Sequence, residues 1–310
     1  MTGFAIAVSE TTFVRAPVHG GLETSLDGGK SWRATLVERP TLGIRGLAVD
    51  GAGTIWATNS RVAWRSQDGS SWVQVDFPRT EPRDNGAVYA QLVTRQEGVW
   101  FVNANDGVLI SPTYAGSQLS WTRLPVPGGR RLMGTAVAGG RFVTLVSAGQ
   151  DVLSIDFTET THRESLVRAN AGGGLLSCSG TACAGLLGQD IVVRDAPDEA
   201  WRTVGHSIQL PKWVVANCRR GLGRIAEYVR NSSDDNFLYA MNGVAFDGTN
   251  IVISASISPD NNGYFPLSLI MGPGGLELVP YGHDGANVRR PGEFWFFEPG
   301  IQQVFVDPPE

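Results

Sequence analysis

The sequence predicts an all-β protein: a β-propeller of four-stranded antiparallel blades, formed as a single domain by residues 1–310. Three observations lead to this prediction. The chain has 39 glycines in 310 residues and only 18% charged residues, a balance typical of short strands joined by tight turns. Tryptophans recur at blade-sized intervals. Short strands rich in small residues recur in the same register, and such repeats of 20–50 residues indicate a modular ring or array.

The tryptophans set the length of the repeat. Trp32 and Trp72 are 40 residues apart, Trp121 follows after 49, and Trp201 follows after 80. The last interval equals two repeats with one tryptophan missing near Thr161. Repeats of this length match the four-stranded units from which propellers are built.

The small-residue strands are expected to be the innermost strand of each blade, because strands crowd together near a propeller's axis and bulky side chains would not fit there. In the second blade, we expect the four strands at 46–50, 54–59, 62–66 and 72–76. Counting units of this kind favours six blades, with seven as the alternative. The expected innermost strands are 3–8, 46–49, 86–90, 134–138, 174–178 and 243–246.

Two turn segments carry a recognisable pattern, Ser-x-Asp followed by Gly and then Trp. The Asp carboxylate can accept backbone N–H groups within the turn, the Gly can take a positive φ, and the Trp can cover the hairpin. Such a motif stabilises a β-hairpin and does not itself perform chemistry. The residues are Ser25, Asp27, Gly29 and Trp32 in the first segment, and Ser66, Asp68, Gly69 and Trp72 in the second, which is one residue shorter.

With these residues, the chain resembles the Asp-box (BNR-repeat) propellers. That group includes sialidases, glucanases, sorting-receptor ectodomains, photosystem assembly factors and phage tail proteins. The resemblance covers about residues 3–206 well and the last third poorly. It implies the propeller fold, but it leaves the function open because one fold supports many functions.

The segment from Cys178 to Cys183 is also similar to a cysteine-bearing blade variant found in some actinobacterial propellers. Four residues between the cysteines would place them opposite each other on adjacent strands, close enough for a disulfide. The alternative is a pair of buried, unbridged cysteines. A disulfide would imply an oxidising or extracellular environment.

Two regions do not follow the repeat. Residues 211–236 are expected to form an insertion between blades or a degenerate blade, and residues 290–310 a C-terminal hairpin that closes or completes the ring. The insertion contains arginines and aromatic residues, the usual anchors of protein interfaces. The predicted binding residues are Trp213, Arg219, Arg220, Arg224 and Tyr228.

Catalysis is not expected. A sialidase of the resembled group carries an Arg-Ile-Pro motif, which is absent here, and the nearest segments, Arg15-Ala16-Pro17 and Arg39-Pro40, do not match it. The acidic residues fall mostly in turns, whereas a glycosidase needs two carboxylates facing each other across a cleft. The four histidines are scattered, so we expect no metal site and no cofactor.

The leading prediction is therefore a non-catalytic binding or structural propeller in a larger assembly, such as a phage tail or tail tip that contacts a host-surface receptor. Its partners would be other proteins of the assembly, or a cell-surface receptor or glycan. The alternatives are a carbohydrate-active propeller and an assembly factor.

The net charge of −5 argues against binding to nucleic acid. The N-terminal segment lacks signal-peptide features and no stretch is apolar enough to span a membrane, so we expect a virion or extracellular location reached without a signal peptide, with the cytoplasm as the alternative.

Overall fold

The computed structural model of the protein describes residues 4–16, 21–36, 43–59, 61–78, 89–115, 118–169, 174–188, 190–205, 210–211, 236–237, 239–257, 265–272 and 275–280. Within these residues the chain forms six four-stranded antiparallel sheets and one two-stranded sheet. We call the four-stranded sheets blades 1 to 6 in chain order.

Every blade is a meander in which each strand pairs with the strand that precedes it in the chain. Blades 1 and 2 comprise β1 (Phe4–Ala7), β2 (Phe13–Ala16), β3 (Leu22–Ser25) and β4 (Arg33–Leu36), then β5 (Gly46–Val49), β6 (Ile55–Thr58), β7 (Val62–Ser66) and β8 (Val73–Asp76). Blades 3 and 4 comprise β9 (Tyr89–Arg95), β10 (Gly98–Asn103), β11 (Val108–Ala115) and β12 (Gln118–Pro125), then β13 (Leu132–Ala138), β14 (Arg141–Ala148), β15 (Asp151–Phe157) and β16 (His162–Arg168). Blades 5 and 6 comprise β17 (Leu175–Ser179), β18 (Ala182–Leu187), β19 (Asp190–Arg194) and β20 (Arg202–Gly205), then β23 (Tyr239–Phe246), β24 (Ile251–Ile257), β25 (Phe265–Gly272) and β26 (Gly275–Pro280).

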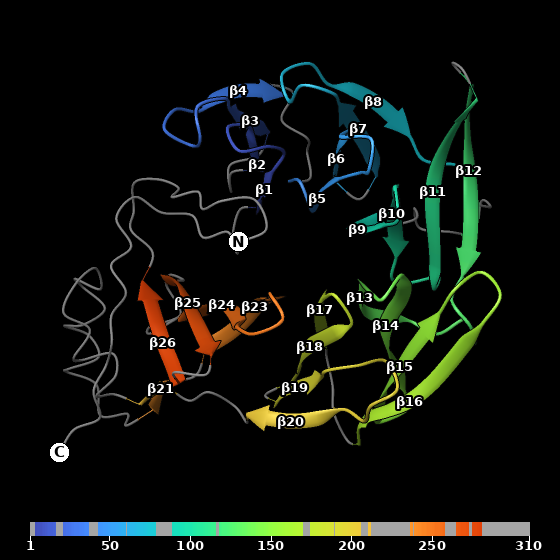
Figure 1. The fold of residues 1–310 in the computed structure, drawn as a ribbon, viewed down its shortest axis with the longest axis vertical. Helices are drawn as coiled ribbons and strands as arrows, with labels where there is room; N and C mark the ends of the chain where they lie inside the picture. Colours follow the sequence, from blue (N-terminus) through green and yellow to red (C-terminus); the bar gives the residue numbers. More distant parts are fainter. Residues whose placement is uncertain are drawn as a thin grey trace.

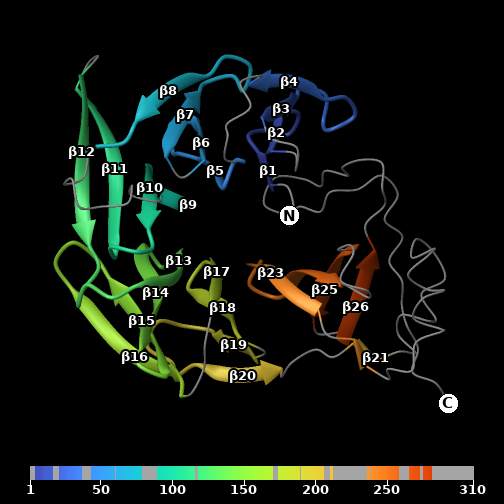
Figure 2. The same ribbon diagram turned by 180° about the vertical axis from the view of Figure 1, so that it is seen from behind.

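The blades are arranged around a common centre (Figure 1), and Figure 2 shows the same arrangement from behind. The first strand of each blade lies innermost and the fourth lies outermost. Successive innermost strands contact each other from β1 through β5, β9, β13 and β17 to β23. The predicted fold class, a β-propeller of four-stranded antiparallel blades, is confirmed. The number of blades in the complete ring stays a prediction.

The innermost strand of blade 3 differs from the expectation. It is β9, Tyr89–Arg95, so only the last two residues of the predicted run 86–90 belong to it, and 86–88 lie outside the described residues. The reason is the register of the β9–β10 hairpin. Arg95 pairs with Gly98 across a two-residue turn at which Gln96 has a φ of +54°. This tight turn determines where the strand ends.

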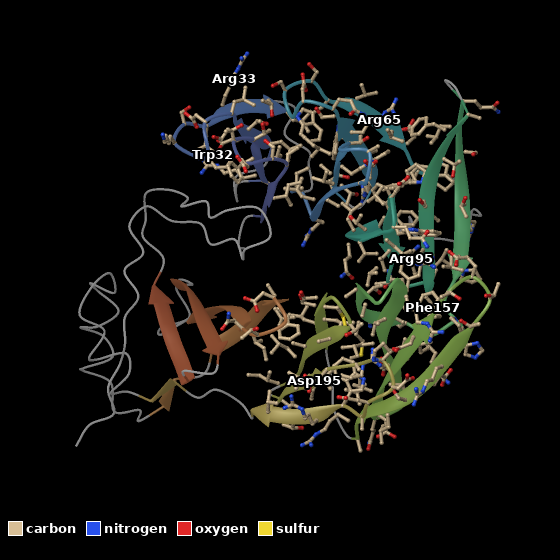
Figure 3. The ribbon with its side chains drawn as sticks, viewed as in Figure 1. Trp32, Arg33, Arg65, Arg95, Phe157 and Asp195 are labelled. Carbon is tan, nitrogen blue, oxygen red and sulfur yellow. A yellow bond between two sulfur atoms is a disulfide. The ribbon has the colours of Figure 1, made fainter. Side chains whose placement is uncertain are left out.

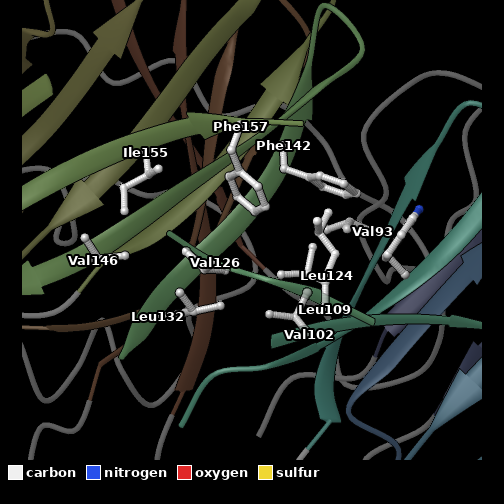
Figure 4. Packing of buried hydrophobic residues seen from close by; sticks show 11 residues of the cluster. Val93, Val102, Leu109, Leu124, Val126, Leu132, Phe142, Val146, Ile155 and Phe157 are labelled. Atoms are coloured by element: carbon white, nitrogen blue, oxygen red, sulfur yellow. The ribbon is translucent and has the colours of Figure 1, made fainter. Parts of the chain in front are cut away.

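The hydrophobic core lies between successive blades, because the middle strands alternate their side chains between two neighbours. In β10, Val99 and Phe101 pack towards blade 2, whereas Trp100 and Val102 pack towards blade 4. All four are less than 10% exposed. Such strands are hydrophobic on both faces, which is why they read as continuous apolar runs. Figure 4 shows the cluster between blades 3 and 4, in which Phe142 and Phe157 of blade 4 lie against side chains of blade 3.

The hairpins nearest the centre are also hydrogen-bonded to one another. Each joins the first and second strand of a blade, and bonds between neighbouring hairpins link the blades in series. These bonds run from Gly51 N–H to Glu97 O (3.0 Å), from Gly139 N–H to Gly180 O (2.8 Å), and from Phe246 N–H to Ser177 Oγ (3.1 Å). The relative placement of the blades is therefore determined by polar bonds at the inner rim as well as by apolar packing.

The two irregular regions of the sequence lie almost wholly outside the described residues. Of the predicted insertion 211–236, only its two ends are described: β21 (Leu210–Pro211) pairs with β22 (Asn236–Phe237). These strands bring the two ends of the segment together. The predicted C-terminal hairpin, 290–310, lies entirely outside the described residues.

Candidate functional site

The first Ser-x-Asp segment forms a hairpin between β3 and β4, which we call the first box hairpin (residues 25–32). Ser25 Oγ donates to Asp27 Oδ1 (2.7 Å) and accepts from the backbone N–H of Gly29 (2.8 Å). Asp27 accepts the hydroxyl (2.6 Å) and the backbone N–H (2.9 Å) of Ser31. These bonds from Ser31, followed by the one from Ser25, hold the pKa of Asp27 well below its ordinary value. The carboxylate therefore stays ionised and stabilises the turn.

The second box hairpin (residues 66–72, between β7 and β8) is one residue shorter and keeps the serine bonds of the first, but its aspartate accepts two backbone N–H groups. Ser66 Oγ accepts from Gly69 N–H (2.8 Å) and donates to Asp68 (3.0 Å). The N–H groups of Ser71 and Ser70 donate to Asp68 and lower the pKa of its carboxyl. Because Gly69 takes a φ of +71°, a conformation that side chains disfavour, the shorter turn still closes.

The second box hairpin also packs against blade 1. A Cβ atom on Gly69 would lie 3.0 Å from Thr24 Cγ2 and 3.2 Å from Val14 Cγ2. Thr24 Oγ1 donates to Gly69 O, and Trp72 Nε1 donates to Thr35 Oγ1 at 3.2 Å. Glycine is needed at position 69 both for its φ and for this close approach. The hairpin thus locks blade 2 to blade 1.

Blade 4 contains a third Ser-x-Asp pair that the sequence analysis missed. Ser154 and Asp156 have the spacing of Ser25 and Asp27, but Thr158 and Thr161 stand where the Gly and Trp would be. Here Thr158 holds the turn, accepting from the N–H of Thr161 at 3.2 Å. The spacing from Ser154 to the missing tryptophan near Thr161 was the signal that could have found it.

Asp156 still accepts from Ser154 Oγ (3.2 Å), and it also forms a buried ion pair with Arg194 of blade 5. Arg194 Nη1 lies 2.9 Å from Asp156 Oδ2, and the two side chains are 1% and 3% exposed. The guanidinium stacks on Trp201, 4.9 Å from the ring centroid. Its Nε and Nη2, and the Nε1 of Trp201, have no hydrogen-bond partner in the described part of the protein. The pair joins two blades in a site closed to solvent.

A similar contact joins blades 3 and 4. Arg95 Nη2 donates to Glu159 Oε2 (3.1 Å), Nη1 bonds Oε1, and Nε donates to the backbone oxygen of Gly140 (2.7 Å). The bonds from Arg95 lower the pKa of Glu159. Figure 3 shows Arg95 on the inner part of the ring. Since Arg95 is nearly buried and doubly bonded to one carboxylate, this pair serves blade packing.

A pocket of about 300 Å³ opens beside the second box hairpin. Arg65 of β7 is one of its lining residues, and the Arg65 guanidinium lies 4.3 Å from the centroid of the Tyr114 ring in blade 3. Burial raises the pKa of Tyr114, and the charge of Arg65 opposes this shift. Besides Arg65, the lining residues include Thr54, Gln67, Asp68, Ser71 and Val73.

Cys178 and Cys183 form a disulfide across the β17–β18 hairpin. They are paired directly in the register of the two strands, with Cα atoms 4.1 Å apart. The hairpin lies at the inner rim, where Gly180 O accepts from blade 4 and Ser177 Oγ accepts from blade 6. The disulfide therefore braces a turn that contacts both neighbouring blades.

The predicted binding residues Trp213, Arg219, Arg220, Arg224 and Tyr228 lie outside the described residues, so their prediction stays untested. Among the residues that the structure does describe, no group of three or more His, Cys, Asp or Glu is placed to hold a metal ion. Within the same residues, no helix has the length and apolar character needed to cross a bilayer.

Comparison with known proteins identifies the fold. No protein-family model and no curated protein matches the sequence. Solved structures do match: the β-propeller domain of Cps50 (Swd1) from Myceliophteria thermophila has a TM-score of 0.54 at 12% identity, with 91% of this chain and 96% of that chain covered. YCF48 bound to D1 peptide has a TM-score of 0.52 at 14% identity, with 91% of each chain covered. A streptogramin B lyase has a TM-score of 0.52 at 13% identity, with 81% of this chain and 74% of that chain covered.

These structures share the fold with this chain and differ from one another in what their names describe. One is a lyase, and another is bound to a peptide. At such low identity the likeness concerns the fold alone. The function must therefore be argued from the residues of this chain.

Proposed function

We propose that this chain is a non-catalytic β-propeller that binds another protein as a component of a larger assembly. A phage tail or tail tip that contacts a host-surface receptor is the setting we favour. The proposal rests on the observation that carboxylates stabilise turns and contacts between blades. Asp27, Asp68 and Glu159 each accept bonds that hold a turn or join two blades, and each has a lowered pKa.

General acid–base catalysis works best with groups whose pKa lies near the working pH. Carboxylates with lowered pKa that are already hydrogen-bonded stay ionised at neutral pH and make poor proton donors. They are suited instead to stiffen a ring that presents surfaces to a partner. YCF48, which has the same fold, was solved with a bound peptide, so this fold is compatible with a protein ligand. The disulfide supports an oxidising, extracellular or virion location.

Particle composition tests the proposal. Mass spectrometry of purified particles or assemblies from the source organism should find this chain in a constant ratio to the other subunits. If the purified particles lack the chain, the tail setting is wrong. The catalytic alternative is tested with a panel of fluorogenic glycosides. Turnover that disappears on changing a carboxylate near the axis would contradict a purely binding role.

A further inference from the structure

Four arginines stack on aromatic rings in the described part of the protein, and one of them differs from the rest. Arg15, Arg95 and Arg194 lie over Trp32, Phe142 and Trp201. Each of these three also pairs with a carboxylate, from Glu23, Glu159 and Asp156 respectively. The fourth is Arg65, which lies over Tyr114 and has no carboxylate or other hydrogen-bond acceptor among the described residues.

The strand register explains why this position is open. In blade 1, Thr24 pairs with Val14 on one side and Arg33 on the other. In blade 2, Arg65 pairs with Trp56 and Val73. Thr24 precedes the box serine Ser25 just as Arg65 precedes Ser66, so the two rows are equivalent. Directly paired residues share one face of the sheet, and in both blades this row faces the following blade.

The two rows are covered differently. The row of blade 1 receives the second box hairpin, whose Gly69 contacts both Thr24 and Val14. Blade 3 has no such hairpin. Its strands β11 and β12 continue past this point, with Tyr114 paired to Leu119. The row of blade 2 is covered instead by two aromatic rings of blade 3, Phe101 against Trp56 and Tyr114 over Arg65, and the pocket opens beside Arg65 and Val73.

The chemistry of the pocket indicates what it can bind. A guanidinium presents several N–H groups in a planar fork that matches a carboxylate, and stacking on Tyr114 holds that fork in one orientation. Next to it, Val73 is 56% exposed and offers an apolar contact. Asp68 also lines the pocket, but its carboxylate accepts bonds from Ser66, Ser70 and Ser71. A pocket of about 300 Å³ is at the small end of the range for ligand sites, large enough for one side chain.

We infer that this pocket, lined by Val73 and by the Arg65 that stacks on Tyr114, is a docking site for an acidic side chain, glutamate or aspartate, of a partner polypeptide. The ligand carboxylate accepts from the Arg65 guanidinium, and its aliphatic part packs on Val73. The inference rests on the proposed function, since it names the chemistry by which a protein partner is held.

The test uses the peptide acetyl-Leu-Glu-Val-Glu-Leu-amide and the same peptide with glutamine in place of both glutamates. Binding is followed by NMR titration of the backbone amide signals of the second box hairpin, which remain in Arg65→Gln, and of the Arg65 Nε–H signal, which is identified by its loss in that variant. We expect the glutamate peptide to shift these signals with a Kd of about 1 mM, typical of one small contact. Arg65→Gln should weaken binding at least about tenfold, which is the effect of removing a charge-assisted pair.

Two further variants make the test specific. Arg33→Gln removes the same charge from the exposed Arg33 of blade 1 (Figure 3) and should bind like the wild type. Val73→Glu places a carboxylate directly across the strands from Arg65 and removes nothing buried. It should weaken binding of the glutamate peptide as strongly as Arg65→Gln does, while the protein stays folded. The test therefore still works if Arg65→Gln misfolds.

The inference is overturned if Arg65→Gln leaves the affinity for the glutamate peptide unchanged, or if the glutamine peptide binds equally well. It is also overturned if free glutarate binds as tightly as the peptide, because the site would then serve a small carboxylate. A native partner that still binds Arg65→Gln with full affinity would refute this pocket and leave the proposed function standing. If the peptide binds at Arg65 but every purified assembly lacks the chain, the pocket stands and the proposed function is refuted.

Discussion

Single hydroxyl and carboxylate groups hold the box hairpins together. Ser66 is the centre of the second hairpin: its Oγ both donates to Asp68 and accepts from Gly69 N–H. Ser66 and Gly69 are both buried, so water cannot replace the lost partner when the hydroxyl is removed. The energetic importance of the motif therefore lies in the serine as much as in the more conspicuous aspartate.

We expect Ser66→Ala to lower the free energy of unfolding by about 1–3 kcal/mol, because it leaves the buried N–H of Gly69 without an acceptor. Ser70→Ala, which removes a hydroxyl from an exposed position of the same hairpin, should change it by less than about 0.5 kcal/mol. Urea unfolding followed by tryptophan fluorescence measures both. Equal effects would show that the Gly69 bond contributes little.

Asp68 predicts a pH dependence whose sign is set by its lowered pKa. A carboxyl whose pKa is lower in the folded than in the unfolded protein stabilises the fold above the unfolded value of about 3.9. This contribution is lost as the pH falls through the folded value. The difference in unfolding free energy between wild type and Asp68→Asn should therefore be constant from pH 7 to about 5 and shrink below about pH 4. A difference that stays constant down to pH 2 would contradict the role given to the ionised carboxylate.

At the scale of elements, hairpins at the inner rim connect the blades, and the β17–β18 hairpin is braced covalently. Cys178 and Cys183 close a loop of four residues, in which Gly180 O accepts from blade 4, and Ser177 Oγ, next to Cys178, accepts from blade 6. A loop this short restricts the unfolded chain only modestly. Its value lies in keeping the turn in the shape that both neighbours contact.

Reduction of the disulfide, or the double change Cys178→Ser and Cys183→Ser, should lower the free energy of unfolding by about 2 kcal/mol, as chain entropy predicts for so small a loop. Thiol titration in denaturant provides the matching chemical test. The chain has 3 cysteines, so one thiol should react before reduction and three after it. Three reactive thiols in the unreduced protein would contradict the bridge.

At the scale of the whole molecule, blades are joined by apolar clusters and by arginine–carboxylate pairs that cross between blades. In two of these pairs, Asp156–Arg194 and Arg95–Glu159, the arginine is buried. The Asp156–Arg194 pair is the more deeply buried, and its remaining N–H groups have no partner among the described residues. A buried pair of this kind contributes little net stability when intact but is costly to break on one side, because an uncompensated charge remains.

We therefore expect Asp156→Leu and Arg194→Met each to lower the free energy of unfolding by about 3–5 kcal/mol. The double variant should recover most of that loss, because no buried charge is left. A double-mutant cycle measured by urea unfolding decides the point. Additive losses would show that the two side chains act independently and that the pair does not couple blades 4 and 5.

Much of this architecture is determined locally and could be predicted from the sequence. The box hairpins use bonds between residues no more than four positions apart, and Cys178 and Cys183 are only five apart. The observed bounds of the four strands of blade 2 lie within a residue or two of the predicted bounds for the same reason. The innermost strands have small side chains because strands crowd together near the axis. The middle strands are apolar because both of their faces are buried.

What only the tertiary structure decided is which distant residues meet between blades. Arg194 pairs with Asp156 across 38 residues, and Arg95 with Glu159 across 64. Neither contact can be predicted from the sequence repeat. The repeat indicates which residues share a strand, but packing between blades determines which residue of the next blade each of them contacts. The Arg65 pocket is of the same kind: it exists because blade 3 lacks the hairpin that blade 2 places on blade 1. Its position depends on how adjacent blades pack, which the sequence of a single blade does not determine.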